Sequence, residues 1–452
     1  MAKRSVMTVP LLLFSSLLHI SHGQLEDLMG FMKIPDSVMN QVDEWTKPVG
    51  SEAAFQPVVS KHASCQKHMS SLMEFPCQKF FNQVAPRSPE PPSSVHQLRP
   101  GDIDVVAAIG DSLVAGDAAL DDSPFSVFIQ YRGVSWCVGG ESDWRRYLTI
   151  PNILKQFNPN ITGYSVGEGS YQSKNSRFNI AMPAALDDDA LKQAQILVSR
   201  VRSDPNINFR KSWKFVTIFI GHNDLCSKAC FNPEKHTALQ HKKQLQKALD
   251  FLKKNMPRTY VSLVTIGDVT YSMKVQRSFM CKLMHPFLCA CLHRGQAKDP
   301  VKWVGNLARE YARAEIELIE SGRYSNDPEF AVELMPFTLF THHLGYRSTP
   351  ADMKSVWMTN KNLISPDCFH MSQAGSALMA NMHWNNLLES NHIRSSSPPN
   401  KIFERFLCPT VNSPYLFTAE NSALFRTQGS QLHSDFQELQ MRTRNFLLPK
   451  YI

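Results

Sequence analysis

The chain has 452 residues, enough for two or three domains of ordinary size or for one large α/β domain. Its hydrophobic fraction of 43% and charged fraction of 19% exclude a disordered or fibrous polypeptide and indicate a globular protein with a sizeable core. The net charge of +8 is modest for this length, so we expect no nucleic-acid partner.

The N-terminus has the pattern of a secretory signal peptide. Lys3 and Arg4 precede a short apolar run at residues 9–20, and small residues follow before a predicted cleavage after Gly23. An uncleaved anchor is the alternative, but the run is short for a membrane span. We therefore expect residues 1–23 to be removed and the protein to be secreted to the extracellular space. The C-terminal region has no apolar stretch long enough for a transmembrane anchor.

Three further regions follow the signal peptide. Residues 24–99 form an N-terminal extension that ends in a Pro-rich segment, residues 86–94, whose composition predicts a semi-rigid linker. The extension can be a propeptide, a small helical cap or a spacer, and its sequence does not distinguish these. Residues 100–395 are predicted to form one globular domain, and residues 396–452 a tail partly packed on that domain.

Within the predicted domain, apolar runs alternate with helical patterns. Apolar residues recur at helical spacing from Leu191 to Val201 and from Val304 to Ile316, and the lysines of residues 242–254 mark the solvent side of another helix. Such alternation predicts a three-layer α/β/α sandwich with a mostly parallel sheet. The predicted strands are residues 103–109, 161–166, 215–220, 260–266 and 330–335.

Two polar motifs each follow one of these predicted strands. Gly110, Asp111 and Ser112 follow the first strand, which places the Ser112 hydroxyl at the carboxyl end of the sheet, where open α/β folds bind ligands. At this position Ser112 is a candidate nucleophile. The alternative interpretation is that Ser112 is the N-cap of a helix. Asn223 follows the strand at 215–220, and its side-chain amide can donate a hydrogen bond to an oxyanion.

A third motif near the other end of the chain supplies a candidate base. Asp367 and His370 are three residues apart, so one turn can bring the carboxylate to Nδ1 of the imidazole. Nε2 then remains available to take the proton of a serine hydroxyl.

The three motifs, in this order, resemble those of the GDSL (SGNH) lipase and esterase superfamily, most closely one repeat of membrane-associated phospholipase B. The similarity covers about residues 93 to 425. It implies a flavodoxin-like sheet and acyl transfer to water without a cofactor or metal. Further matching segments are residues 130–136, 157–159, 163–167, 224–226, 320–324, 384–389 and 413–417.

The resemblance also implies residue roles. Ser112 attacks the ester carbonyl, His370 accepts its proton, and Asp367 orients the imidazole, with Asp224 as the less favoured alternative acid. The Asp224 side chain is instead expected to fix the turn that aims Asn223.

The implied oxyanion hole contains two donors besides the Ser112 amide: the Asn223 side chain and the amide of Ala184. Ala184 stands where the family has glycine, which preserves the donor unless the position requires positive φ. A second departure is His222, also glycine in close relatives, which we expect to line the substrate pocket together with Trp136.

The resemblance therefore predicts a secreted esterase that hydrolyses fatty-acyl esters of phospholipids or lysophospholipids, with transient contact to a lipid surface. Two alternatives remain: a secreted esterase for non-lipid acyl groups such as acylated sugars, and a catalytically impaired lipid-binding relative, which the changes at Ala184 and His222 would suit.

Ten cysteines in a secreted chain indicate disulfides. Asn160 begins a glycosylation sequon, which suits secretion. The spacing of Cys281, His285, Cys289, Cys291 and His293 fits no common zinc site, so disulfides are favoured over a metal there. The predicted pairs are Cys65 with Cys77, Cys226 with Cys230, Cys281 with Cys289 or Cys291, and Cys368 with Cys408.

Overall fold

A computed structural model describes residues 64–121, 128–274, 279–295, 297–344, 361–399 and 401–428. Its centre is a parallel sheet with the strand order β1-β2-β3-β4. Four of the five predicted strands are confirmed within a few residues. These strands are β1 (Ile103–Gly110), β2 (Trp213–Phe219), β3 (Thr259–Val264) and β4 (Phe330–Met335).

The fifth predicted strand, residues 161–166, is not formed as a strand. Only isolated parallel bridges join this segment to its neighbours, including one from Thr162 to Val105 on β1. Gly163 breaks the extended conformation with φ +97°, and a Cβ there would lie 2.3 Å from the Val106 carbonyl oxygen. The segment still lies beside β1 in the position that a flavodoxin-like order assigns to it.

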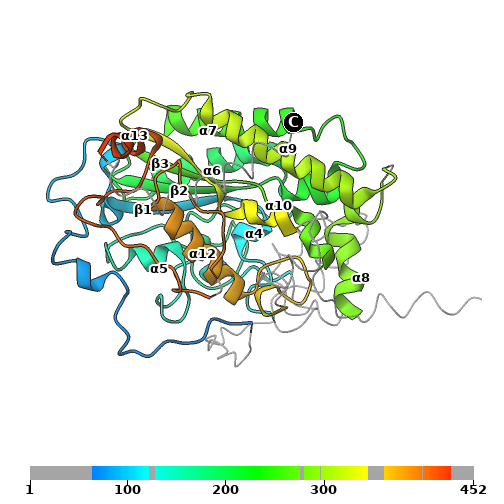
Figure 1. The fold of residues 1–452 in the computed structure, drawn as a ribbon, viewed down its shortest axis with the longest axis horizontal. Helices are drawn as coiled ribbons and strands as arrows, with labels where there is room; N and C mark the ends of the chain where they lie inside the picture. The colour runs from blue at the N-terminus through cyan, green and yellow to red at the C-terminus, as the bar shows by residue number, and fades with distance from the viewer. Residues whose placement is uncertain are drawn as a thin grey trace, which may run out of the picture.

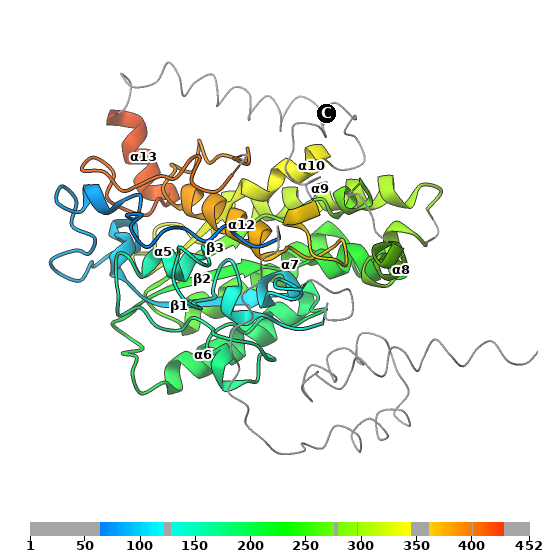
Figure 2. The same ribbon diagram turned by 90° about the horizontal axis from the view of Figure 1, so that it is seen from below.

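Helices cover both faces of the sheet and form a three-layer sandwich (Figure 1, Figure 2). One face carries α6 (Ala190–Ser203), α7 (Ala238–Asn255) and α9 (Pro300–Glu320), while the other carries α5 (Ile150–Leu154) and α12 (Gln373–Leu387). The remaining described α-helices are α4 (Ser112–Ala115), α8 (Phe279–Leu288), α10 (Thr341–Leu344) and α13 (Ala419–Gln428).

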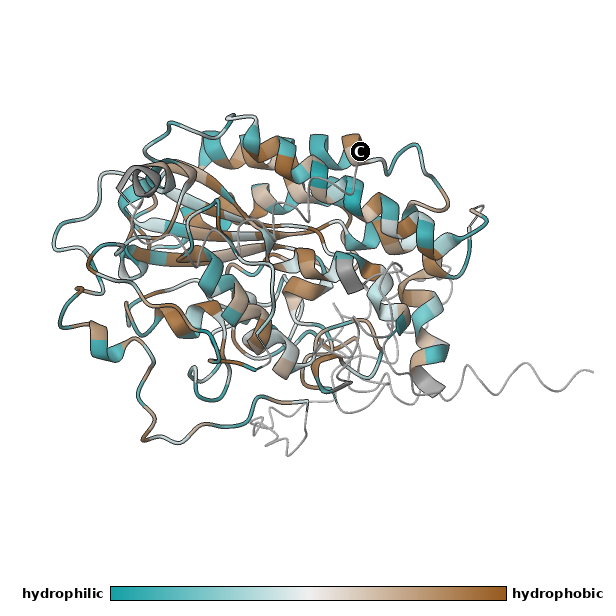
Figure 3. Ribbon diagram, viewed as in Figure 1, coloured by the Kyte–Doolittle hydropathy of each residue, from teal (hydrophilic) through white to brown (hydrophobic). Residues whose placement is uncertain are grey.

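The burial of β1 shows why its sequence is apolar from Val105 to Ile109. Val105 and Ala107 pack into the core under α6 and α7, whereas Val106 and Ala108 pack into the core under α12. A strand covered on both faces needs apolar residues at every position. Brown strands between helices with teal outer faces show the same pattern in Figure 3.

Segments that precede and follow the sheet domain in the sequence contribute residues to the hydrophobic core under α12. Phe75, Leu98 and Leu416 are buried there, and the Leu416 N–H donates to the Leu98 carbonyl at 2.7 Å. The Pro-rich segment 86–94 lies along the domain rather than as a free spacer, since the Trp213 indole donates to the Pro92 carbonyl at 3.2 Å. The predicted signal peptide, residues 1–23, lies outside the described residues.

The structure corrects every predicted disulfide pairing. Cys77 pairs with Cys408, Cys226 with Cys289, Cys230 with Cys291 and Cys281 with Cys368. Cys65 and Cys137 are free. The predictions paired near neighbours in sequence, but the observed partners are 61 to 331 residues apart and are brought together by the tertiary fold.

Candidate active site

Ser112 lies where the sequence predicts, directly beyond the carboxyl end of β1. It is the first residue of α4, and Asp111 before it is the N-cap, accepting the Leu113 N–H at 2.9 Å. Ser112 is therefore not the cap, which leaves its hydroxyl free of that role. The Ser112 hydroxyl oxygen is 2.8 Å from His370 Nε2, within hydrogen-bond distance, across 258 residues of sequence.

The loop 365–370 holds His370 through a dense set of hydrogen bonds. Asp367 Oδ2 is 2.5 Å from His370 Nδ1, and Asp367 Oδ1 accepts the Ser365 hydroxyl and the backbone N–H groups of Phe369 and His370 at 2.9 to 3.0 Å. Ser112, His370 and Asp367 thus form one hydrogen-bonded chain, in which Asp367 rather than Asp224 contacts the imidazole.

Burial and charge act in opposition on this chain. Burial alone would lower the pKa of His370, but the charge of Asp367 and its hydrogen bond outweigh burial, so the pKa of His370 rises above its ordinary value. Burial would raise the pKa of Asp367, but His370 and the backbone donors lower it. The pair therefore favours an ionised Asp367 beside a strongly basic imidazole.

Asn223 contacts the segment that contains Ala184 and Ala185, beyond the carboxyl ends of the strands. The Asn223 amide donates one hydrogen to the Ala185 carbonyl at 3.0 Å, and because an amide carries two hydrogens, the bond fixes the group without exhausting it. Ala184 has φ +57°, the left-handed conformation that favours glycine. Alanine adopts it at a cost of about 1–2 kcal/mol. The position therefore has the positive φ that was named above as the condition that puts this donor in doubt.

The structure places His222 beside the nucleophile, on the wall of a pocket. Its Nδ1 is 3.2 Å from Asp111 Oδ2, and its ring packs edge-on against Phe219 with centroids 4.3 Å apart. Trp136 also lines this pocket, with its indole donating to the Leu113 carbonyl at 3.0 Å. The other lining residues are Leu113, Phe219, Gly267, Val269, Tyr271, Ser272, Thr338, Phe340, Thr341, Phe369, Met371 and Met379.

Sequence reasoning missed most of these lining residues. They come from the segments that follow β3 and β4, from the loop around His370 and from α12, and they are apolar or weakly polar, like ordinary core residues. Except for Phe369 and Met371, which flank His370, they lie in no local motif, because only the tertiary fold brings them to Ser112. Trp144, which lies near Trp136 in the sequence, packs instead against Phe75 and Phe403 and is not among the lining residues.

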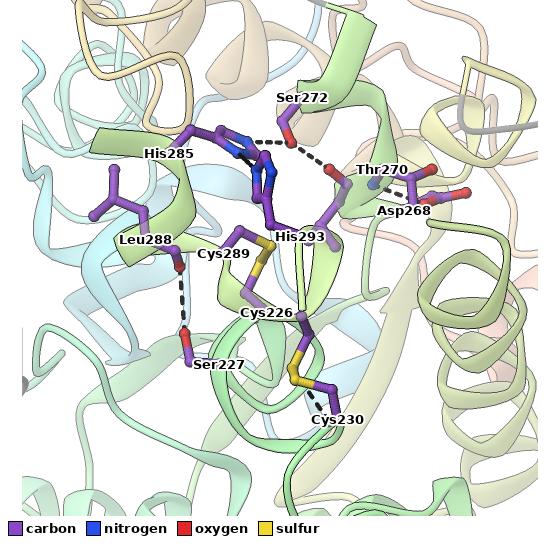
Figure 4. The surroundings of a disulfide bond; sticks show 12 residues. Cys226, Ser227, Cys230, Asp268, Thr270, Ser272, His285, Leu288, Cys289 and His293 are labelled. Atoms are coloured by element: carbon purple, nitrogen blue, oxygen red, sulfur yellow. Dashed lines mark hydrogen bonds between the residues drawn. A yellow bond between two sulfur atoms is a disulfide. The ribbon is translucent and has the colours of Figure 1, made fainter. Parts of the chain in front are cut away.

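The cysteine- and histidine-rich segment 281–293 is built around disulfides. Figure 4 shows Cys226 joined to Cys289 near the rings of His285 and His293. His285 Nδ1 is 2.8 Å from His293 Nε2. His285 Nε2 is also 2.8 Å from the Ser272 hydroxyl. In the part of the chain that the structure describes, no group of three or more candidate ligands is arranged to hold a metal.

Comparison with known proteins identifies the family of this fold and site. A family model described as GDSL-like Lipase/Acylhydrolase matches residues 106–382. Phospholipase B1, membrane-associated, from Homo sapiens is 36% identical over 352 residues, which is 75% of this chain and 23% of that protein. Its counterpart from Mus musculus is 35% identical over 346 residues, 74% of this chain and 22% of that protein. The chain thus spans less than a quarter of the length of these relatives.

The parallel sandwich agrees with the fold of this family. The chain belongs to the GDSL-like lipase and acylhydrolase family.

Proposed function

We propose that this protein is a secreted serine esterase that hydrolyses fatty-acyl esters of phospholipids and lysophospholipids. One observation carries the proposal: an apolar pocket lies beside the hydrogen bond between Ser112 and His370, with Leu113 and Phe369 on its wall. A pocket of this composition favours an alkyl chain over a sugar. The similarity to proteins named phospholipase supports the same substrate class.

The reaction follows from the atoms that surround Ser112. His370 Nε2 takes the hydroxyl proton while Ser112 Oγ attacks the ester carbonyl, and Asp367 stabilises the imidazolium that forms. The tetrahedral intermediate collapses when His370 returns the proton to the leaving alcohol, which produces an acyl-enzyme. Water, deprotonated by His370, then attacks the acyl group and releases the fatty acid and the free Ser112 hydroxyl.

The two departures from the family pattern leave the contact between Ser112 and His370 in place. His222 is held by Asp111 while Ser112 still reaches His370, whereas Ala184 adopts the left-handed conformation that favours glycine. The retained contact between Ser112 and His370 favours an active enzyme over an impaired lipid-binding relative, and the strained Ala184 does not distinguish the two.

Asn223→Ala should lower kcat by a factor on the order of 10²–10³ with little change in KM. The Asn223 amide would face negative charge that is present only in the transition state, so its loss should leave ground-state binding intact. Steady-state kinetics with a soluble ester measure both constants. An unchanged kcat would place the oxyanion donors elsewhere.

Removing the bond between Cys281 and Cys368 by replacing both cysteines with alanine should lower kcat roughly 10- to 100-fold. The disulfide ties α8 to the loop between Asp367 and His370, so its loss loosens the base before the fold is lost.

The matched control is the double alanine variant of Cys77 and Cys408, which removes a disulfide distant in sequence from the motifs. This double variant should have a lower melting temperature than the wild type. Its kcat should be unchanged at temperatures where it remains folded. Equal kcat values in the two double variants would contradict the role of the Cys281–Cys368 bond.

Secretion is supported by two features of the described residues. Four disulfides suit an oxidising compartment, and Asn160 is exposed in a turn, accessible to glycosylation. No described helix combines the length and apolar character needed to cross a membrane. Recovery of the protein from the culture medium with Gln24 as its first residue, and with a glycan on Asn160, checks this part of the proposal.

A substrate panel tests the proposed activity. The purified protein is treated with a fluorophosphonate probe and separately given lysophosphatidylcholine, diacyl phosphatidylcholine, a triacylglycerol and an acetylated sugar. We expect labelling of Ser112 and release of fatty acid from the phospholipids. Turnover of the acetylated sugar alone would redirect the proposal to non-lipid esters, and the absence of both labelling and turnover would overturn it.

A further inference from the structure

Behind the two proposed oxyanion donors lies a chain of buried ionisable side chains that no sequence motif marks. His241 Nδ1 is 3.3 Å from Asp187 Oδ2, and His241 Nε2 is 3.2 Å from Glu315 Oε1. Asp187, His241 and Glu315 are each at most 3% exposed. We call these three residues, together with Asp224 and His236, the buried charge network.

The second half of the network runs through Asp224. The Asp187 N–H donates to Asp224 Oδ2 at 2.9 Å, and Asp224 Oδ1 is 2.8 Å from His236 Nδ1. Burial is the main cause that raises the pKa of Asp224 to about 6, with the hydrogen bond from His236 opposing it. The side chain therefore has two fixed partners, neither of which is His370.

The geometry around His241 fixes the charge of its ring. Both ring nitrogens face carboxylate oxygens, and an ionised carboxylate only accepts hydrogen bonds, so both nitrogens must carry hydrogen. Burial alone would lower the pKa of His241, but Asp187 and Glu315 outweigh it and raise the pKa to about 9. Tyr311 stacks on the ring with centroids 4.3 Å apart. Such a buried ion group is costly compared with an apolar core of the same size, so stability alone does not explain it.

The network connects the segments that carry the oxyanion donors. Asp187 follows Ala184 and Ala185 closely, and Asp224 directly follows Asn223. The His241 ring also packs against the start of the Asn223 loop, because a Cβ at Gly221 would lie 2.9 Å from His241 Cε1.

Glu315 anchors this arrangement to the rest of the fold. Its Oε2 accepts the Ile266 N–H at 2.8 Å, just beyond β3, while its Oε1 contacts His241 on α7. The carboxylate, itself on α9, thus joins two helices and a strand end.

From this arrangement we infer that His241, held between Asp187 and Glu315, is a positioning residue that sets the oxyanion donors of Ala184 and Asn223 relative to each other. It touches no reacting atom and acts through the two loops that it joins. The inference rests on the proposed function, because it requires an oxyanion to form at Ser112.

Glu315→Gln is the most informative variant. A glutamine oxygen can still accept the Ile266 N–H, which turns the new amide hydrogens toward His241 Nε2 and forces that nitrogen to become an acceptor. The ring then loses its charge with almost no change in side-chain size. We expect kcat to fall roughly 10- to 100-fold with KM nearly unchanged, because the donors are displaced from the transition state.

A double-mutant cycle with Asn223→Ala separates positioning from general destabilisation. If Glu315 acts through the donors, Glu315→Gln should cost much less in the Asn223→Ala background than in the wild type. The matched control is Glu333→Gln, since Glu333 is also buried, pairs with Arg394 at 3.0 Å and accepts a backbone N–H from Ala419. The Glu333→Gln variant should have a lower melting temperature than the wild type and an unchanged kcat.

If the wild-type protein is active, two results would overturn the inference. One is an unchanged kcat in a folded Glu315→Gln variant. The other is a double variant whose loss in kcat equals the product of the losses in Glu315→Gln and Asn223→Ala. If Glu315→Gln does not fold, Glu315→Asp replaces it in the same cycle, since it keeps the charge and withdraws the carboxylate from His241. A wild-type protein without ester turnover would instead remove the proposed function, and this inference with it.

Discussion

Ser112→Ala is expected to abolish both fluorophosphonate labelling and the hydrolysis of every ester substrate, with a loss in kcat of about 10⁶. The Ser112 hydroxyl is the only group that the hydrogen-bonded chain with His370 and Asp367 can activate, because it alone contacts His370 Nε2 among the described hydrogen bonds. The free energy of unfolding should change by less than about 1 kcal/mol, since one oxygen is lost at a turn whose cap is Asp111.

The matched control for this variant is Ser176→Ala. Ser176 is also buried, and its hydroxyl donates to the Tyr171 carbonyl at 2.7 Å, so the same oxygen is removed at a place with no link to His370. Ser176→Ala should keep labelling and turnover. A Ser112→Ala protein that still takes up the probe would show that another residue is the nucleophile.

Asp367→Asn should lower kcat by up to about 10⁴ while the protein stays folded. The asparagine oxygen can keep the three hydrogen bonds that Asp367 Oδ1 accepts from Ser365, Phe369 and His370, so the loop is preserved. Its NH₂ group would then face His370 Nδ1, which forces the hydrogen onto Nε2. A ring with a hydrogen on Nε2 cannot accept the proton of Ser112.

Asp224→Asn provides the contrast, measured by kcat and melting temperature together. Asp224 contacts His236 and the Asp187 N–H, not His370, so its replacement should lower the melting temperature and reduce the rate less than Asp367→Asn does. A larger rate loss in Asp224→Asn than in Asp367→Asn, with only the Asp367 variant destabilised, would reverse the two assignments.

The sequence predicts the sheet and the main motifs because both depend on local patterns. The continuous apolar run of β1 reports burial on both faces, and the three-residue spacing of Asp367 and His370 suits a single turn. Conversely, the strand predicted at 161–166 fails at Gly163, since only the tertiary structure shows how closely that backbone approaches Val106.

Long-range partners could not be predicted in the same way. Cys281 is 87 residues from Cys368, and nothing in their neighbourhoods distinguishes that pairing from a shorter one. His241 and Glu315 lie on helices whose patterns specify only which face is buried, so the contact between their side chains depends on how α7 and α9 pack. The conformation of Ala184 likewise depends on its surroundings, although the sequence identified it as the position where φ matters.

The packing of the flanking segments determines which piece of chain can be excised as a working unit. A fragment limited to the matched span, residues 106–382, would begin within β1 and end within α12. It would also lose Leu98 and Leu416, which bond to each other across the core, and the bridge from Cys77 to Cys408. A fragment that keeps these contacts therefore extends at least from Cys77 to Leu416.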